Sequence, residues 1–173
     1  NLSLLQVLDL SKDNIHGHLP IDFSHLQVLF AAENEFYGSI PESLGILQEL
    51  KFLNLYDNKL TCTIPFAFAN LSKLEHLNIG QNHIHGNIPS KLVSIIRLQF
   101  FSVEKNNLTD TLPDSLFNLS ALQPLSFMTN QLTGHLPKDV GHFLPNLQSL
   151  AMSDNNFDGP FPPSFSNSTS LQT

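Results

Sequence analysis

A unit of about 24 residues, a period typical of repeat arrays, recurs along the whole chain and constrains its fold more than any other feature. The pattern L-x-x-L-x-L-x-x-N-x-L-x-G-x-I-P can be aligned seven times. The seven cores begin at Leu5, Leu26, Leu50, Leu74, Leu98, Leu122 and Leu147, so only the first interval is clearly shorter than the others. A fixed period of this size predicts an elongated array in which each coil completes the hydrophobic core of its neighbours.

Each part of the unit has a predicted structural role, counted here from the first leucine of each core as position one. Apolar residues at positions four and six alternate with variable ones, which indicates one short strand per coil. The strands of stacked coils should form a parallel sheet with a step of about 4.8 Å. The proline at position sixteen fixes φ and should end strand pairing on the back of the coil.

Position nine is predicted to hold a ladder of asparagines, whose amides can both donate to and accept from buried backbone groups. It carries Asp13, Asn34, Asn58, Asn82, Asn106, Asn130 and Asn155. Because an ionised aspartate can only accept hydrogen bonds, the ladder should be weakest at Asp13, in the first coil.

Position thirteen is glycine in five coils, but Cys62 and Asp110 occupy it in the other two. Glycine there suggests positive φ or a close approach. The presence of cysteine and aspartate argues against a strict need for positive φ at Cys62, with Asp110 the more tolerant of the two. The only cysteine of the chain is either a tolerated, inert substitution or a reactive group, and no electropositive context favours the second interpretation.

The concave side of the array should display positions three, five, seven and eight, which do not point into the core. One part of it is rich in aromatic residues with no role in the core, flanked by two charges, and is predicted to bind a peptide or protein ligand. The predicted binding residues are Phe30, Phe52, Tyr56, His76, Phe100, Glu104 and Lys105. The alternative is that these are the scattered aromatics common on solenoid sheets.

Metal binding and catalysis are not expected. The pairs His16/His18 and His83/His85 fall on turns and lack a third ligand at a metal-binding spacing, so a surface role with mild pH sensitivity is favoured. No phosphate loop, nucleophile elbow or kinase signature is present, which predicts a non-enzymatic chain without a cofactor. The net charge of −7 argues against a nucleic-acid partner, and no apolar stretch reaches the roughly 18 residues of a membrane span.

Five N-x-S/T sequons suggest passage through the secretory pathway, although N-L-S could also be a by-product of the repeat. They are Asn1, Asn70, Asn107, Asn118 and Asn167. All but Asn107 fall at position twenty-one, away from the strand, so that glycans there would leave the strand face open. A glycan on Asn107 would lie beside the aromatic residues.

The repeat, with its trailing G-x-I-P, resembles the plant-specific type of leucine-rich repeat. This resemblance implies an α/β-type solenoid over residues 1–173, a right-handed superhelix with a concave parallel sheet and a mostly irregular convex side. With no cap at either end, the chain is expected to be a segment of a longer protein. Residues 136–172, "LPKDVGHFLPNLQSLAMSDNNFDGPFPPSFSNSTSLQ", resemble one receptor-kinase subfamily, which contains the bacterial elongation-factor receptor and the rice blight-resistance receptor.

Membership of that subfamily implies the ectodomain of a single-pass plasma-membrane receptor with a cytoplasmic Ser/Thr kinase outside this chain. Such an ectodomain would bind a microbial or endogenous peptide in defence or development and recruit a co-receptor kinase. The alternatives are a kinase-less receptor-like protein and a secreted inhibitor resembling those of polygalacturonases, both extracellular. An ice-binding derivative would need a regular row of Thr or Asn, and the strand-face columns are chemically mixed.

Overall fold

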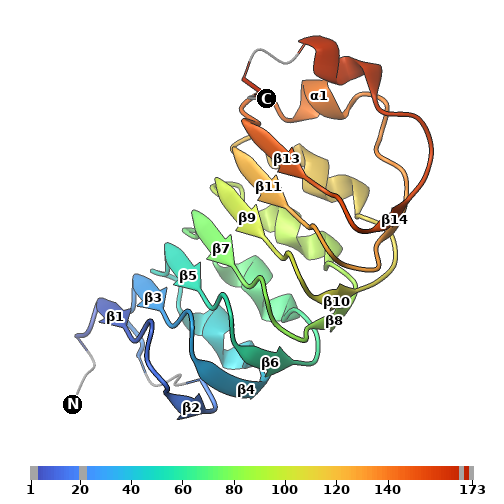
Figure 1. Cartoon of the computed structure of the whole chain (residues 1–173). Coiled ribbons are helices and arrows are strands. Elements are labelled where there is room, and N and C mark those ends of the chain that lie inside the picture. Colours follow the sequence, from blue (N-terminus) through green and yellow to red (C-terminus); the bar gives the residue numbers. More distant parts are fainter. Residues whose placement is uncertain (1–3, 20–22, 168–169, 172–173) are drawn as a thin grey trace.

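A seven-stranded parallel sheet runs the length of the molecule (Figure 1). The computed structural model describes residues 4–19, 23–167 and 170–171. The strand order is β1-β3-β5-β7-β9-β11-β13, one strand from each predicted coil. These strands are Val7–Asp9, Val28–Phe30, Phe52–Asn54, His76–Asn78, Phe100–Ser102, Pro124–Ser126 and Ser149–Ala151. The coils are in register, as Leu53 lies opposite both Leu29 and Leu77, which confirms the solenoid predicted from the repeat.

A second set of short strands follows position nine of each coil and was not predicted. These strands are β2 (His16–Gly17), β4 (Glu35–Ser39), β6 (Lys59–Thr61), β8 (His85–Gly86), β10 (Asn107–Leu108), β12 (Thr133–Gly134) and β14 (Asn156–Phe157). They pair in parallel as β2-β4-β6, β10-β8 and β12-β14. Each coil therefore has a hydrogen-bonded side face in addition to its strand face (Figure 1).

The convex side is more regular than the mostly irregular backbone expected. It carries one helical turn per coil from the second coil onward: η1 (Glu42–Ile46), η2 (Phe66–Asn70), η3 (Ser90–Ser94), η4 (Asp114–Asn118), α1 (Val140–Phe143) and η5 (Pro163–Asn167). All are 3-10 helices except α1. The position-sixteen proline immediately precedes η1 to η4 with φ between −59° and −68°. Proline suits this place because its fixed φ is extended or helical and its missing N–H is not needed there.

The core is a continuous column of leucine, isoleucine and phenylalanine between the sheet and these turns. Leucines at positions one and four are fully buried in the middle coils, and Phe68, Phe101, Phe117 and Phe127 are the largest fully buried side chains. Because each coil contacts only its neighbours, stability is distributed along a line of coil-to-coil interfaces.

The asparagine ladder links each coil to the one before it. Asn82 is representative: its Nδ2 donates to the carbonyls of Leu55, Ile79 and Gly80 at 2.9–3.2 Å, and its Oδ1 accepts from Leu60 N at 3.0 Å. Asn34, Asn58, Asn106, Asn130 and Asn155 make the corresponding contacts. Asp13 makes no side-chain hydrogen bond within the described residues, and the expected weakness of the first coil stays a prediction.

The backbone at position thirteen corrects the interpretation of Cys62. Cys62 has φ 66° and Asp110 has φ 65°, the left-handed conformation that Gly38, Gly86 and Gly134 adopt at the equivalent place. The expectation that Cys62 escapes positive φ was therefore wrong. The pairing of neighbouring coils fixes this turn, so the local backbone conformation persists whichever residue occupies it. A cysteine side chain has no local hydrogen bond to the backbone that favours this conformation, as an aspartate can have.

Replacing Cys62 with glycine should stabilise the protein by about 1 kcal/mol, because it removes the steric cost of Cβ in the left-handed conformation. The measurement is the urea-unfolding midpoint. Cys62→Ala is the matched control, since it removes the thiol but keeps Cβ, and we expect it to leave stability nearly unchanged. A gain with alanine equal to that with glycine would assign the effect to the thiol instead.

Candidate ligand-binding surface

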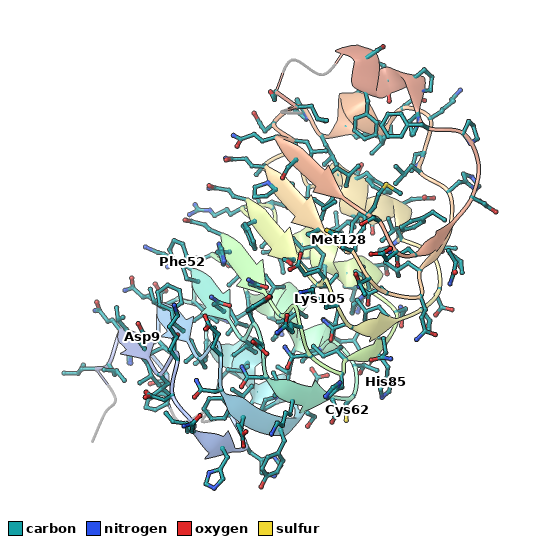
Figure 2. The ribbon with its side chains drawn as sticks, in the orientation of Figure 1. Asp9, Phe52, Cys62, His85, Lys105 and Met128 are labelled. Carbon is teal, nitrogen blue, oxygen red and sulfur yellow. The ribbon has the colours of Figure 1, made fainter. Side chains whose placement is uncertain are left out.

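Three rings form a continuous stack across the middle of the strand face. Phe52, His76 and Phe100 occupy position three of successive coils, on β5, β7 and β9, and lie opposite one another in register. The ring centroids of Phe52 and His76 are 6.0 Å apart, and those of His76 and Phe100 are 4.1 Å apart with planes 9° from parallel. All three rings are half-buried although none lies in the core (Figure 2 labels Phe52).

A shallow hollow follows this stack toward the N-terminal ends of the strands. Besides the three rings, its lining consists of Glu75, Gln99, Gln123 and Pro124. Its floor is therefore aromatic and apolar, and its rim carries one carboxylate and two amides. Such a combination of an apolar floor with a few polar groups is typical of surfaces that bind peptides or small ligands.

The other predicted binding residues do not join the stack. Phe30 lies in the next row, opposite Asn54. Tyr56 and Lys105 both contact Gln81: the Tyr56 hydroxyl donates to Gln81 Oε1 at 3.0 Å, and Lys105 Nζ donates to the same oxygen at 3.2 Å. The predicted surface is thus divided between a ring stack and a polar group around Gln81.

Glu104, another predicted binding residue, forms a hydrogen bond with the next coil toward the C-terminal end of the array. Its Oε2 accepts a hydrogen bond from the Ser126 hydroxyl at 2.8 Å. Sequence reasoning missed the rim residues of the hollow, which stand at position two. A signal for them existed, because position two is glutamine in five of the seven coils: Gln6, Gln27, Gln99, Gln123 and Gln148.

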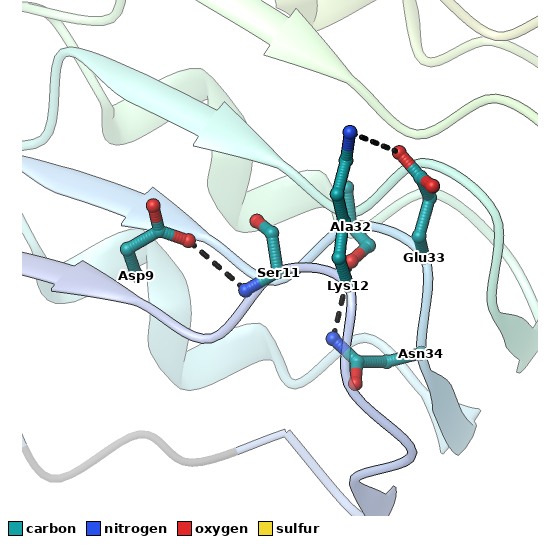
Figure 3. A network of polar contacts seen from close by, with 6 residues as sticks. All are labelled: Asp9, Ser11, Lys12, Ala32, Glu33 and Asn34. Atoms are coloured by element: carbon teal, nitrogen blue, oxygen red, sulfur yellow. Dashed lines mark hydrogen bonds and ion pairs between the residues drawn. The ribbon is translucent and has the colours of Figure 1, made fainter.

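The N-terminal end of the strand face carries local polar contacts (Figure 3). Asp9 Oδ1 accepts a hydrogen bond from Ser11 N at 2.9 Å, which holds the pKa of Asp9 below its ordinary value. Lys12 Nζ lies 3.7 Å from Glu33 Oε1, and both side chains are exposed. Exposed pairs of this kind contribute little to stability, so they mainly moderate the charge of the surface.

His76 is the titratable group of the stack, and burial lowers its pKa from the ordinary value of 6.5. The unfolded chain therefore binds a proton at a higher pH than the folded chain. This favours the folded state above about pH 6.5, and the advantage is lost as the pH falls through the depressed pKa of the folded protein.

Stability should consequently fall as the pH is lowered from neutral toward about 5, and replacing His76 with phenylalanine should reduce that slope. The measurement is the midpoint of urea unfolding as a function of pH for both proteins. His85, which is exposed on β8, provides the control: His85→Phe should leave the slope as in the wild type. An unchanged slope in His76→Phe would contradict the assignment.

The other sequence candidates lie away from this surface. Figure 2 shows Cys62 and His85 on the side face, far from Phe52. His16, His18, His83 and His85 are all exposed, and within the described residues no group of three or more His, Cys, Asp or Glu side chains is arranged to hold a metal ion. Cys62 is exposed, with its sulfur 3.7 Å from the Thr61 hydroxyl.

Two of the five sequons are exposed on the convex side, as predicted. Asn70 ends η2 and Asn118 ends η4, both far around the coil from the strand face. Asn107 is exposed on β10, in the side face. Asn1 and the side chain of Asn167 lie outside the described residues. Their occupancy by glycans stays a prediction.

Stacked coils, an internal asparagine ladder and an open strand face define a solenoid repeat protein. The chain belongs to the leucine-rich-repeat family: the family model described as Leucine Rich Repeat matches residues 49–71, 73–95, 97–119 and 146–168, together more than half of the chain. In the part of the chain that the structure describes, no helix is long and apolar enough to cross a bilayer.

Plant receptor-like proteins and receptor kinases are among the known relatives. Receptor-like protein 41 of Arabidopsis thaliana is 40% identical over 80 residues, which cover 43% of this chain and 9% of the relative. The ectodomain of the Arabidopsis thaliana receptor kinase GASSHO1/SCHENGEN3, solved in complex with CASPARIAN STRIP INTEGRITY FACTOR 2, superimposes with a TM-score of 0.87 at 29% identity. That match covers 95% of this chain and 23% of the receptor chain.

A plant ice-binding protein is also similar, with a TM-score of 0.77 at 28% identity over 91% of this chain and 61% of that chain. The shared coil geometry thus occurs in proteins of more than one function. The present chain spans about a tenth of the length of the curated relatives it matches.

Proposed function

We propose that this chain is an extracellular ligand-recognition segment of a plant leucine-rich-repeat receptor and binds a peptide on its strand face. The observation that carries the proposal is the stack of Phe52, His76 and Phe100, which exposes apolar surface where the core does not require it. Exposed apolar surface on a soluble protein usually marks an interaction site, and aromatic side chains are typical anchors. The similarity to GASSHO1/SCHENGEN3, a receptor crystallised with a factor bound, supports the same use of the scaffold.

The finer proposal is a receptor-like kinase of the subfamily that contains the bacterial elongation-factor receptor and the rice blight-resistance receptor. It rests on the resemblance of residues 136–172, and it would add a co-receptor kinase and a role in defence or development. A kinase-less receptor-like protein is the second candidate, favoured by the similarity to Receptor-like protein 41. Sequencing the intact transcript distinguishes them, since only the first encodes kinase motifs downstream of a membrane span.

An ice-binding role has weaker support in the described surface. The side face does carry Thr61, Thr109 and Thr133 at position twelve, but Tyr37 and His85 interrupt that column. A flat array that matches ice needs an uninterrupted row, whereas recognition of a peptide by side chains is compatible with a mixed surface. Measuring thermal hysteresis of the purified protein would test this role directly.

The experiment that tests peptide binding compares the intact protein with a double variant, Phe52→Ser/Phe100→Ser, as bait for peptides of plant extracellular fluid and of bacterial culture. Retained peptides are identified by mass spectrometry. Phe66→Ser is the matched control, because Phe66 is equally aromatic, 61% exposed and on the convex side. Circular dichroism verifies that each variant is folded.

We expect at least one peptide to be retained by the wild type and by Phe66→Ser but lost from the double variant. A tenfold loss of affinity corresponds to about 1.4 kcal/mol, which is less than two buried aromatic anchors usually contribute. Peptides retained equally by all three proteins, or lost only from Phe66→Ser, would contradict binding at the strand face.

A further inference from the structure

The strand face has no free backbone groups to offer a ligand. β7 is hydrogen-bonded on one side to β5 and on the other to β9, and β9 is bonded in turn to β11. A peptide crossing these strands therefore cannot add itself to the sheet as a further strand, which is the usual way in which extended peptides gain main-chain hydrogen bonds. Recognition has to rest on side chains, and it favours a ligand conformation that needs no backbone partner.

The polyproline II helix is such a conformation, because it has no internal hydrogen bonds and leaves its carbonyls free. It repeats every three residues at about 3.1 Å each, so equivalent side chains recur about every 9.3 Å. Adjacent coils are about 4.8 Å apart, which puts alternate coils about 9.6 Å apart. The observed ring-to-ring steps of 6.0 and 4.1 Å lie on either side of one coil spacing.

Other regular conformations fit this spacing less well. Side chains on one face of a β-strand recur about every 6.6 Å, which matches neither one coil nor two. Residues seven apart on an α-helix are about 10.5 Å apart, so they drift by almost 1 Å over every two coils. Of these three repeats, that of polyproline II lies closest to the spacing of alternate coils, and Phe52 and Phe100 stand two coils apart on β5 and β9.

The rim of the hollow supplies donors for the free carbonyls of such a ligand. Gln99 is exposed, and its side chain makes no hydrogen bond within the described residues. Gln123 accepts a hydrogen bond from Gln148 Nε2 at 3.2 Å through its own Oε1, which leaves its Nε2 free to donate. Two amide donors thus lie on successive coils at the Phe100 end of the aromatic row, where they can donate to ligand carbonyls, whereas the rim position beside His76 carries the carboxylate of Glu75.

We propose, as a development of the function above, that the hollow binds a proline-rich segment in the polyproline II conformation, lying across the strands. Two prolines three residues apart pack against Phe52 and Phe100, and the Gln99 and Gln123 amides donate to carbonyls at and beyond the proline on Phe100. Aromatic rings bordered by hydrogen-bond donors are a combination that other proteins use for proline-rich peptides. Stacking against Phe100 already covers one face of the His76 ring.

The test is selection of binders from a library of short random peptides displayed on phage, using the intact protein as bait. Each selected peptide is then synthesised and titrated against the wild type, Phe52→Ser/Phe100→Ser and Gln99→Ala/Gln123→Ala. The second double variant alters only rim side chains, so it tests the same hollow even if the ring variant loses its fold. Binders with two prolines are also resynthesised with the second proline moved from the third to the second following position, which preserves composition.

The expected result is enrichment of peptides with prolines three residues apart, whose affinity drops at least tenfold in the shifted peptide and in the ring variant. The rim variant should weaken the same peptides about threefold to tenfold, as expected for one or two hydrogen bonds. Binders that require the rings but contain no spaced prolines would overturn this inference and leave the proposed function intact. A library that yields no binder, or only binders that the ring variant and the rim variant retain, would overturn this inference and the proposed function together.

Discussion

Replacing Asn82 with aspartate should destabilise the protein by about 3 kcal/mol or more, although the two side chains have the same shape. The amide is 6% exposed and donates to three backbone carbonyls, those of Leu55, Ile79 and Gly80. A carboxylate has no proton to donate, so it would face the three oxygens as an unpaired buried charge, or take up a proton to avoid it. Either way the free energy of unfolding falls, and it falls most at high pH, where ionisation is favoured.

The matched control is Asn54→Asp, the same exchange on the strand face. Asn54 uses only its oxygen, Oδ1, which accepts from Tyr56 N at 3.1 Å. Asp9 makes the same contact with Ser11 in the first coil, so an aspartate is compatible with that turn. Urea unfolding should show a change of less than about 0.5 kcal/mol for Asn54→Asp. Equal losses in the two variants would contradict the donor role of Asn82.

The repeat predicts so much of this fold because it encodes interactions between neighbours. A leucine one repeat period after another occupies the same place one coil further on, so the register of Leu29, Leu53 and Leu77 follows directly from the spacing. The asparagine ladder was predictable for the same reason, since an amide in a buried turn must satisfy backbone groups. Backbone torsions follow less directly: the left-handed turn at Cys62 is imposed by coil pairing, and its glycine preference was visible only in the other coils.

The candidate site was predictable to a similar extent. Phe52, His76 and Phe100 follow one another at one repeat period each, so their alignment in one row follows from the sequence. Phe30 was grouped with them but stands at position five, and a shift from position three to position five along a strand leads to another row. The contact of Tyr56 with Gln81 depends on the orientation of two long side chains, which spacing alone does not determine.

Contacts between convex turns were likewise not visible in the sequence, and Gly45 shows the consequence. It lies in η1 at position twenty, where the three following coils carry Ala69, Val93 and Phe117. A Cβ added at Gly45 would lie 2.5 Å from both Ala67 Cβ and the Ala67 carbonyl oxygen, on η2 of the next coil. Position twenty therefore accommodates side chains in the following coils. The glycine at this position in η1 reflects the close approach of η1 and η2.

The variants Gly45→Ala and Gly45→Val test the close approach of η1 and η2, because it determines whether they raise or lower stability. Reduced freedom of the unfolded chain alone would make alanine stabilising by about 0.5–1 kcal/mol, since Gly45 does not need positive φ. Overpacking against a backbone atom opposes this and typically costs about 1–3 kcal/mol. Because 2.5 Å is well inside normal contact, we expect packing to dominate: a loss of about 1 kcal/mol for alanine and about 3 kcal/mol for valine.

Ala69→Val is the control for Gly45→Val, because it enlarges the same position one coil later to the size already present as Val93. Its cost should stay below about 1 kcal/mol, mostly from the lower helix propensity of valine. Thermal and urea unfolding of the three variants give the comparison. If Gly45→Ala raised the unfolding midpoint, the turns η1 and η2 would have to separate freely, and the local stiffness expected of stacked coils would not hold at this end of the solenoid.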